Sequence, residues 1–411
     1  MPSPAGRRSA QSADSGDNRG MPKLTSLLLN VGHALDHLFL LIFATAVGAI
    51  AVDFGVGRWE DMMPYTVGAF VLFGIGSIPA GRLGDLWGRR RMMVVFYVGM
   101  GLSGLLVAAT QSPWQMALAL TLMGAFSAIY HPVGIPFLVQ RSTTPGLTIG
   151  INGLAGNMGI ALAALSTGFW VQYFGWRMAF VMPSLLSLVC AWLFWRHAPQ
   201  ETSAPAKKNN TPVHLPKNLA MRTLLVMIGS AITTSVLFNF TTNGNAQLLA
   251  ERLQGLVHEP VMIGVLLACM YAVASFAQVA VGRLIDRVPV KPLLFSIIVA
   301  QAVIFLLAAN ATGWLWYAAA ILYMVTVFGA IPFNDVMVVR YIDDSLRSRV
   351  SGTRIAVSFG FSSLVVYLLG PMVKQEGFAT LMLVMSCVAA LGALIVLWLP
   401  GEAQMRMARQ S

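Results

Sequence analysis

The sequence contains little charge and little cysteine. Only 10% of its 411 residues are charged, whereas a soluble protein carries about 25%. The three cysteines, Cys190, Cys269 and Cys387, lie in apolar runs and have the spacing of neither a disulfide framework nor a metal site. Hydrophobic residues make up 57% of the chain. These deficits argue against a soluble domain or a disulfide-linked scaffold, and they indicate that lipid surrounds most of the chain.

Several functional motifs are also missing. The chain has no phosphate-binding glycine loop, no nucleophile elbow and no cysteine cluster for zinc. We therefore expect no enzyme, no cofactor and no resident metal, and we expect an ion gradient to be the energy source. The net charge of +11 comes without a basic patch interleaved with aromatic residues, so nucleic acid is not an expected partner.

Twelve apolar runs are long enough to cross a bilayer, which takes roughly 20 residues for about 30 Å of hydrocarbon. We expect membrane-spanning helices at residues 24–52, 62–83, 92–110, 113–140, 146–173, 176–197, 220–249, 260–282, 291–309, 313–341, 350–373 and 376–399. The sequence therefore predicts an all-α membrane protein.

Polar segments divide this series of helices. Residues 198–219 contain no apolar run and are predicted to form a cytoplasmic linker between two six-helix halves, residues 24–197 and 220–399. Residues 1–23 are mainly polar and lack the apolar core of a signal peptide, so we expect a disordered cytoplasmic tail. Residues 400–411 form a second cytoplasmic tail.

Lys and Arg are unevenly distributed in this topology. With the N-terminus in the cytoplasm, 23 of the 27 basic residues fall in the tails, linker and loops on that side. Arg58, Arg177, Arg252 and Lys374 fall on the other side. The positive-inside rule then predicts that both termini are cytoplasmic, and we expect a multi-pass protein of the bacterial inner membrane.

Two of the cytoplasmic loops are alike. The loop "GRLGDLWGRRR" begins at Gly81, and "GRLIDR" begins at Gly282. Gly81 and Gly282 are separated by the same 201 residues as Asp85 and Asp286. Two homologous halves explain this repeat, and such halves hold a substrate site between them near the middle of the membrane.

The first loop resembles the loop 2–3 signature of the major facilitator superfamily, a Gly-x-x-x-Asp element followed by Gly and arginines. The resemblance covers residues 24–400 and implies the family's fold, twelve transmembrane helices in two pseudo-symmetric halves. In the family the acid and the arginines pair across the cytoplasmic face and latch the outward-open state. The resemblance assigns a cytoplasmic gate to Gly81, Asp85, Gly88, Arg89, Arg90, Gly282, Asp286 and Arg287.

Within that superfamily the sequence is most similar to the fosmidomycin-resistance group. Three segments carry the resemblance: a Gly-His start followed by an acid in the first span, "IYHPVG" in the fourth and "GLAGNMGIALAAL" in the fifth. The sequence differs from the group at two places, where it has Asp36-His37 in place of an Asn-Asp pair and Val133 in place of an acid. The resemblance implies efflux of a drug or another small organic compound.

Asp36 is the most costly residue of the first span. It lies about 12 residues into the span, roughly 18 Å at 1.5 Å per residue, and a charge at mid-membrane costs about 2.5–3.5 kcal/mol. His33 and His37 share its helix face because they are three and four residues apart. This face must therefore point into the bundle.

Three interpretations of this face remain open. Asp36 can be the proton-coupling site, with His33 and His37 adjusting its protonation. The two histidines can instead form a metal pair with Asp36 beside them. The cluster can also be a buried hydrogen-bond network that orders helix packing.

Other polar residues of the spans are candidates for a substrate cavity, although each alone can serve packing. They are His131, Asn152, Asn157, Asn239, Asn243, Asp335 and Arg354. His131 precedes Pro132, which removes a backbone hydrogen bond and favours a kink.

These observations predict a secondary active transporter that exports a small organic compound in exchange for protons by alternating access. The alternative is proton-coupled uptake of a small organic acid or of a metal ion such as copper, to which the 23 methionines and the histidine pair are suited. We expect the lipid bilayer, protons and a small-molecule substrate as partners, and a monomeric protein.

Overall fold

The computed structural model describes residues 21–140, 142, 144–200, 217–341, 344–401 and 404, and it is helical throughout this part of the chain. The long helices are α1 (Lys23–Asp53), α2 (Val67–Trp87), α3 (Arg89–Ala108), α4 (Pro113–Ser127), α6 (Pro145–Phe174), α7 (Trp176–His197), α8 (Lys217–Arg252), α9 (Pro260–Ile285), α10 (Val290–Ala308), α11 (Gly313–Tyr341) and α12 (Asp344–Leu397). The short ones are η1 (Trp59–Asp61), η2 (Met63–Thr66), the π-helix η3 (Tyr130–Gly134) and α5 (Ile135–Val139).

Eleven helices of the described residues are long and apolar enough to span a membrane. Helix α12 carries the last two predicted spans, residues 350–373 and 376–399. At Gly377 its backbone leaves the helical conformation, with φ at 77° and ψ at 170°. Positive φ is accessible to glycine at little cost, so this residue allows the break. The prediction of an all-α membrane fold is confirmed, and its count of twelve holds only if α12 is counted as two helices.

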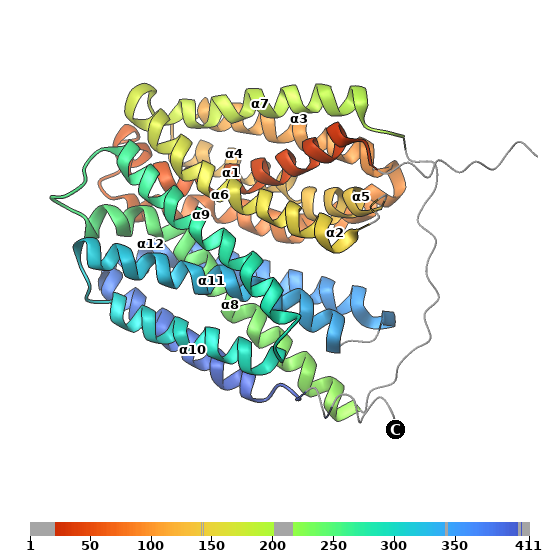
Figure 1. Ribbon diagram of the computed structural model, residues 1–411. Helices are drawn as coiled ribbons and strands as arrows, with labels where there is room; N and C mark the ends of the chain where they lie inside the picture. Colours follow the sequence, from red (N-terminus) through yellow and green to blue (C-terminus); the bar gives the residue numbers. More distant parts are fainter. Residues whose placement is uncertain are drawn as a thin grey trace, which may run out of the picture.

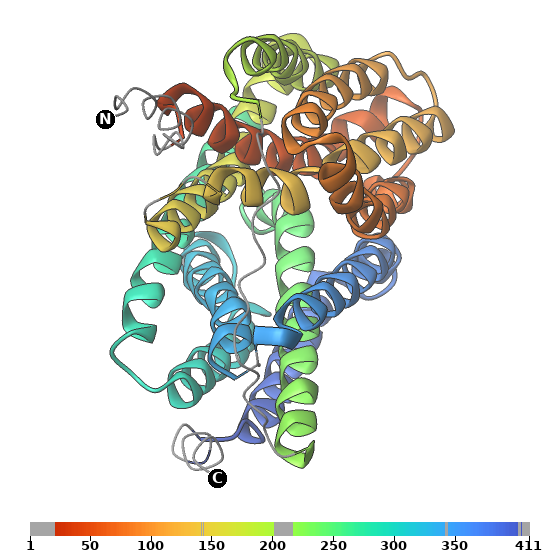
Figure 2. The same ribbon diagram turned by 90° about the vertical axis from the view of Figure 1, so that its right-hand side faces the viewer.

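The helices gather in two groups (Figures 1 and 2). Helices α1–α7, which we call the first half, lie in the upper part of Figure 1, and α8–α12, the second half, lie below them. Helix α1 begins, α7 ends and α8 begins at the right-hand end of Figure 1. We call this the linker end and the opposite one the far end. The predicted linker lies largely outside the described residues, as do most of the two tails.

Glycines bring the helices of the first half very close together. A Cβ atom on Gly159 of α6 would lie 2.1 Å from the backbone oxygen of Ala34 on α1, and one on Gly124 of α4 would lie 2.1 Å from that of Ala69 on α2. In lipid the hydrophobic effect does not drive helices together, because the lipid tails are as apolar as the helix surfaces. Helices associate there by close packing of their backbones at small residues. Gly159, the last glycine of "GLAGNMG", therefore allows α1 to lie close against α6.

The fourth predicted span is interrupted, as expected from Pro132. Helix α4 ends at Ser127, the chain passes through the π-helical turn η3, and α5 continues from Ile135. Proline lacks a backbone N–H, and π-turns inside α-helices occur mostly at functional sites. The turn presents His131 toward α1.

We expect Gly159→Ala to destabilise the protein by about 1–3 kcal/mol, because its methyl group would overlap the backbone of α1. Gly153→Ala is the matched control on the same helix, since a Cβ atom there meets nothing within 4 Å. Thermal unfolding of the purified variants in detergent should show a lower midpoint for Gly159→Ala only. Equal midpoints would contradict the close α1–α6 contact.

Candidate functional site

The carboxyl group of Asp36 is completely buried inside the first half. The Ser127 hydroxyl, at the end of α4, donates a hydrogen bond to its Oδ1 atom. Its Oδ2 atom has no hydrogen-bond partner, and His131 Nε2 lies 3.5 Å from it. Among the described residues, the imidazole of His131 is the one ion-pair partner of this acid.

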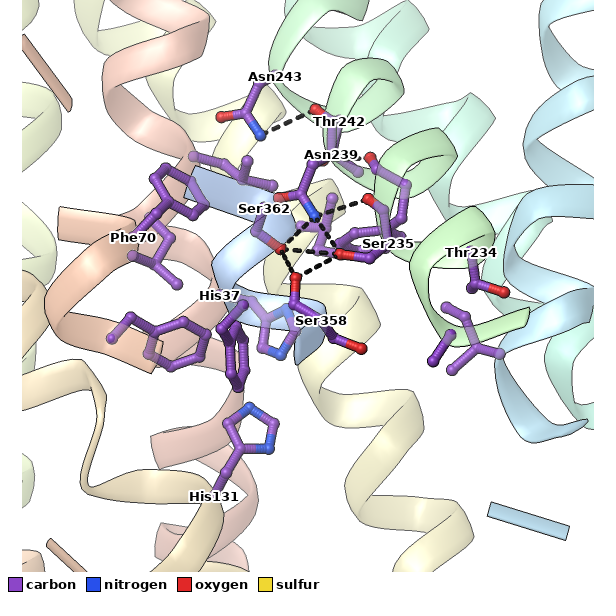
Figure 3. Close-up of a pocket in the computed structure, with 18 of the residues that line it drawn as sticks. His37, Phe70, His131, Thr234, Ser235, Asn239, Thr242, Asn243, Ser358 and Ser362 are labelled. Atoms are coloured by element: carbon purple, nitrogen blue, oxygen red, sulfur yellow. Dashed lines mark hydrogen bonds between the residues drawn. The ribbon is translucent and has the colours of Figure 1, made fainter. Parts of the chain in front are cut away.

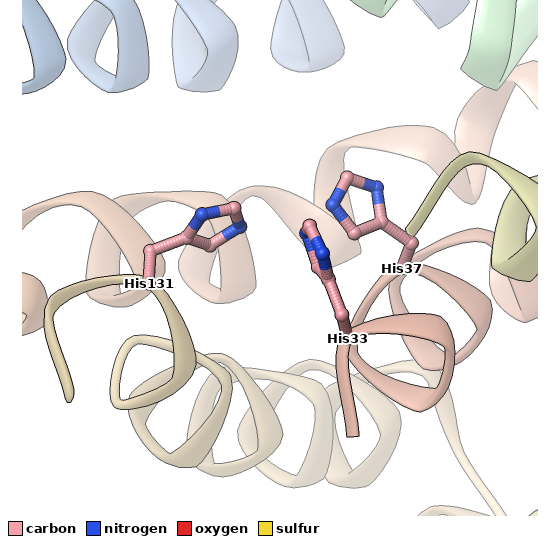
Figure 4. Close-up of side chains that lie close together, drawn as sticks. All are labelled: His33, His37 and His131. Atoms are coloured by element: carbon pink, nitrogen blue, oxygen red, sulfur yellow. The ribbon is translucent and has the colours of Figure 1, made fainter. Parts of the chain in front are cut away.

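Three histidines lie close together beside this site (Figure 4). His33 and His37 come from α1 and His131 from η3, and the three rings offer nitrogen atoms that lie within 4.8 Å of one another. His33 Nδ1 donates a 2.7 Å hydrogen bond to the backbone oxygen of Asn152, and its Nε2 atom is buried without a partner. His37 Nε2 is also buried without a partner. The centroids of the His33 and His37 rings lie 4.9 Å apart on one face of α1, and the centroid of the His131 ring from η3 lies 5.1 Å from that of His33.

Helix α6 supports this cluster through Asn152 and Gly156. Asn152 Nδ2 donates to Asn30 Oδ1 at 2.9 Å and to the Tyr130 hydroxyl at 2.7 Å. The Tyr130 ring stacks on His33, with 4.8 Å between the ring centroids. A Cβ atom on Gly156 would lie 2.7 Å from the His33 ring, so glycine leaves the space that this imidazole occupies.

A cavity of about 220 Å³ lies between the two halves (Figure 3). The first half contributes His37 and His131 together with an apolar wall of Leu40, Leu41, Phe70, Phe73 and Ile160. The second half contributes most of the polar groups, which are Thr234, Ser235, Asn239, Thr242, Asn243, Asn334, Ser358 and Ser362. The cavity is therefore asymmetric, and His131 contacts both its interior and the buried acid.

Hydrogen bonds within the second half order this polar wall. Asn239 Nδ2 donates to Ser362 Oγ at 2.8 Å, and the Ser235 and Ser362 hydroxyls lie 3.0 Å apart. Asn243 Nδ2 donates to the Asn239 backbone oxygen at 3.0 Å. The buried side-chain oxygens of Asn243 and Asn334 have no donor.

The residues predicted for the cavity occupy different places. His131, Asn239 and Asn243 line it. The remaining asparagines serve contacts between helices: Asn152 joins α6 to α1, and Asn157 donates to Gln278 on α9. The side chain of Asp335 lies outside the described residues. Arg354 lies on α12, one turn before the lining residue Ser358.

Sequence analysis missed Ser127 and the serines of α12. Ser127 precedes His131 by four residues, a helical spacing that places two side chains on one face and could have indicated it. Ser358 and Ser362 are also four residues apart, but serine is common in membrane helices and carries no charge that would single it out. Phe73 and Phe359 were also missed, because phenylalanine is common in membrane helices and carries no charge.

Part of the predicted gate packs against the turn that carries His131. A Cβ atom on Gly81 would lie 3.3 Å from Pro132, and one on Gly84 would lie 2.9 Å from Val133. Gly88 joins α2 to α3 with a φ of 92°, a conformation that favours glycine. Close packing and a positive φ thus explain why glycine occurs at these positions of the first half.

The charged gate residues contact their own half. Arg89 lies 3.8 Å from Asp85, and Arg90 donates to the backbone oxygen of Trp195 at the end of α7. In the second half, Asp286 and Arg287 are exposed at the end of α9, and a Cβ atom on Gly282 would meet nothing within 4 Å. The latch role that the family resemblance assigns to them remains a prediction.

The two halves make direct contacts at the far end. Lys374 Nζ on α12 donates to Asp61 Oδ1 at 2.6 Å, and the rings of Trp59 and Phe378 stack with 6.0 Å between centroids. In the same loop the hydrogen bond and the charge of Glu60 raise the pKa of the Arg58 guanidinium. Because Glu60 is paired with Arg58, Lys374 is left to pair with Asp61.

Helices of membrane-spanning length in two groups, with a cavity between them, define a membrane transporter. Residues 29–352 match the model of the Major Facilitator Superfamily. The chain belongs to this family. It is therefore a multi-pass membrane protein of a transporter family.

Individual relatives are distant. The puromycin resistance protein pur8 of Streptomyces alboniger is 29% identical over 143 residues, which cover 34% of this chain and 28% of pur8. The multidrug resistance protein MdtG of Citrobacter koseri is 23% identical over 283 residues, covering 67% of this chain and 68% of MdtG. The crystal structure of a D-xylose-proton symporter superposes with a TM-score of 0.74 at 15% identity, covering 92% of this chain and 98% of that one.

The contact between Asp61 and Lys374 leads to a prediction about how readily the two halves separate at the far end. In a cysteine-free background, Lys374→Met should speed the labelling of Met63→Cys by an impermeant maleimide. Met63 is buried where η2 meets Gly370 of α12. A partly exposed ion pair contributes about 0.2–1 kcal/mol, so the increase should be at most about fivefold.

Arg177→Met is the matched control for this measurement. It removes the ion pair of Arg177 with Asp53, which lies within the first half, and should leave labelling of Met63→Cys unchanged. The same acceleration in both variants would mean that the Asp61–Lys374 pair does not hold the halves together.

Proposed function

We propose that this protein exports a small organic compound in exchange for protons, by alternating access of the cavity to the two sides of the membrane. The observation that carries the proposal is the position of Asp36. Its side chain is fully buried, and its Oδ2 atom faces His131, which lines the cavity. A carboxyl group and an imidazole at this border are suited to pass a proton between the cavity and the interior of the first half.

The energetic argument concerns the charge of Asp36. A carboxylate in lipid-enclosed protein costs free energy unless donors compensate it, and Ser127 supplies one hydrogen bond to Oδ1. Binding a proton removes this cost. Asparagine would fill a similar volume without the cost of a buried charge, so a role in packing explains the acid poorly. Proton binding and release, by contrast, require a carboxyl group.

The orientation of the transporter follows from its basic residues. With 23 of 27 Lys and Arg residues on the linker side, the positive-inside rule supports a cytoplasmic linker side, and the bacterial relatives support the inner membrane. Lys374 and Asp61 join the halves at the opposite end. We infer that this conformation faces the cytoplasm, where the compound to be exported would enter the cavity.

The direction of transport rests on two kinds of similarity. The names of pur8 and MdtG associate them with resistance to puromycin and to multiple drugs. The segments around His33, His131 and Gly156 are similar to those of the fosmidomycin-resistance group. These similarities favour export over uptake.

A second candidate function is uptake of a transition-metal ion. Nitrogen atoms of His33, His37 and His131 that lie within 4.8 Å of one another favour it, because imidazole binds copper and zinc. Uptake of an organic acid has less support, since no Arg or Lys is among the cavity-lining residues that the structure describes.

The substitution Asp36→Asn tests the proposal. In proteoliposomes we expect it to abolish transport driven by a pH gradient, because the amide cannot release a proton. Exchange of labelled substrate across the membrane should persist, since exchange needs no net proton release. Asp53→Asn, the same change at the exposed far end of α1, should retain gradient-driven transport.

Metal binding to the same variants separates the two candidates. The metal candidate predicts that His37→Gln lowers the affinity for Cu²⁺ or Zn²⁺ sharply in calorimetry, while Asp36→Asn has a mild effect. Unimpaired gradient-driven flux in Asp36→Asn would falsify the proton-coupled mechanism.

A further inference from the structure

We infer that the compound carried in the cavity is an uncharged aromatic molecule that presents hydrogen-bond donors, such as hydroxyl groups, to the second half. This inference rests on the proposed function, because it names the substrate class of the same cavity. Four properties of the lining carry it: aromatic contacts, unpaired acceptors, the lack of charge, and size.

Aromatic side chains from both halves form one part of the lining. Phe70 and Phe73 come from α2, and Phe359 comes from α12. The centroids of Phe73 and Phe359 lie 4.4 Å apart with an angle of 72° between their planes. Rings arranged in this way favour a third ring against their faces or edges. A flat aromatic ligand would contact both halves at once.

The polar part of the lining offers acceptors that lack donors. The side-chain oxygens of Asn243 and Asn334 are buried and have no hydrogen-bond partner among the described residues, and Asn243 is only 1% exposed. The amide nitrogen of Asn243 is already bonded to Asn239. An unpaired buried acceptor costs about 1–3 kcal/mol. A ligand hydroxyl that donates to these oxygens would remove that cost.

Several donors of the polar wall are already used within the second half. Asn239 Nδ2 donates to Ser362, and the Thr242 hydroxyl donates to the backbone oxygen of Phe238 at 2.7 Å. A ligand that carried acceptors alone, such as an ether or an ester, would therefore find few free donors on this wall. Hydroxyl or amino groups fit it better.

The described lining carries no Lys, Arg, Asp or Glu. A carboxylate or phosphate ligand would enter this cavity without a Lys or Arg side chain to compensate it, which is unfavourable. Asp36 does not line the cavity, because His131 lies between them. The lining thus favours a ligand without a formal charge.

The volume limits the size of the ligand. Sites for drug-sized molecules occupy about 300–1,000 Å³, whereas this cavity encloses about 220 Å³. A compact fused-ring compound fits this space better than a large macrocycle or a peptide.

Three anthraquinones of similar shape test the inference. They are 2,6-dihydroxyanthraquinone, its 2,6-dimethoxy analogue and anthraquinone-2-carboxylate. Binding to the purified full chain in detergent can be followed by quenching of tryptophan fluorescence, at a pH that keeps the hydroxyl groups protonated. We expect the dihydroxy compound to bind about tenfold more tightly than the dimethoxy compound, and the carboxylate to bind more weakly than either.

Variants of the acceptors show whether the preference arises in this cavity. Asn243→Leu and Asn334→Leu should each reduce the preference for hydroxyl over methoxy several-fold. Asn245→Leu is the matched control on α8, because the Asn245 side chain accepts from Tyr323 and does not line the cavity. It should keep the preference. A preference that survives both lining substitutions, equal binding of the two neutral probes, or tightest binding of the carboxylate would overturn the inference.

Binding and transport can fail separately. The expected binding pattern without gradient-driven flux in the wild type would support the substrate class and reject proton coupling. Gradient-driven flux of another compound, with none of the three probes bound, would support the proposed function and reject this inference.

Discussion

A carboxyl group inside a membrane protein must find hydrogen-bond donors within the protein or bind a proton, because lipid supplies neither. Asp36 meets this constraint with Ser127 on one oxygen and His131 beside the other. Both partners come from the interrupted fourth span, one at the end of α4 and one in the π-turn η3. The segment around Pro132 therefore forms part of the environment of the acid.

The same turn contacts the loop that resembles the family gate. Pro132 and Val133 pack against the positions of Gly81 and Gly84 on α2, where any side chain would crowd them. This contact places the gate loop directly against the turn that carries His131, within the first half. It also explains why two glycines, and not only one, occur at the end of α2.

Much of the fold could be predicted from the sequence, because the length of an apolar run and the bias of Lys and Arg are local properties. The break of α12 at Gly377 lies next to the expected boundary between residues 373 and 376, where Lys374 and Glu376 interrupt the apolar runs. The site was only partly predictable. His33, Asp36 and His37 share one helix face by spacing alone. The approach of His131 depends on how α1 and η3 are rotated and packed, and the pairing of Asp61 with Lys374 joins residues 313 positions apart.

The two halves supply different kinds of side chain to the cavity, and the local sequence could not indicate this difference. The first half holds every described ionisable group at the cavity, whereas the polar groups of the second half are uncharged hydroxyls and amides; both halves add apolar side chains. The loops that begin at Gly81 and Gly282 are alike in sequence, so the asymmetry concerns the lining of the cavity and not these loops. A ligand that contacts both walls would be held by the second half and would lie beside His37 and His131 of the first. Its presence would exclude water from the imidazole next to Asp36, and this competition for one small space is a physical basis for coupling between ligand and proton.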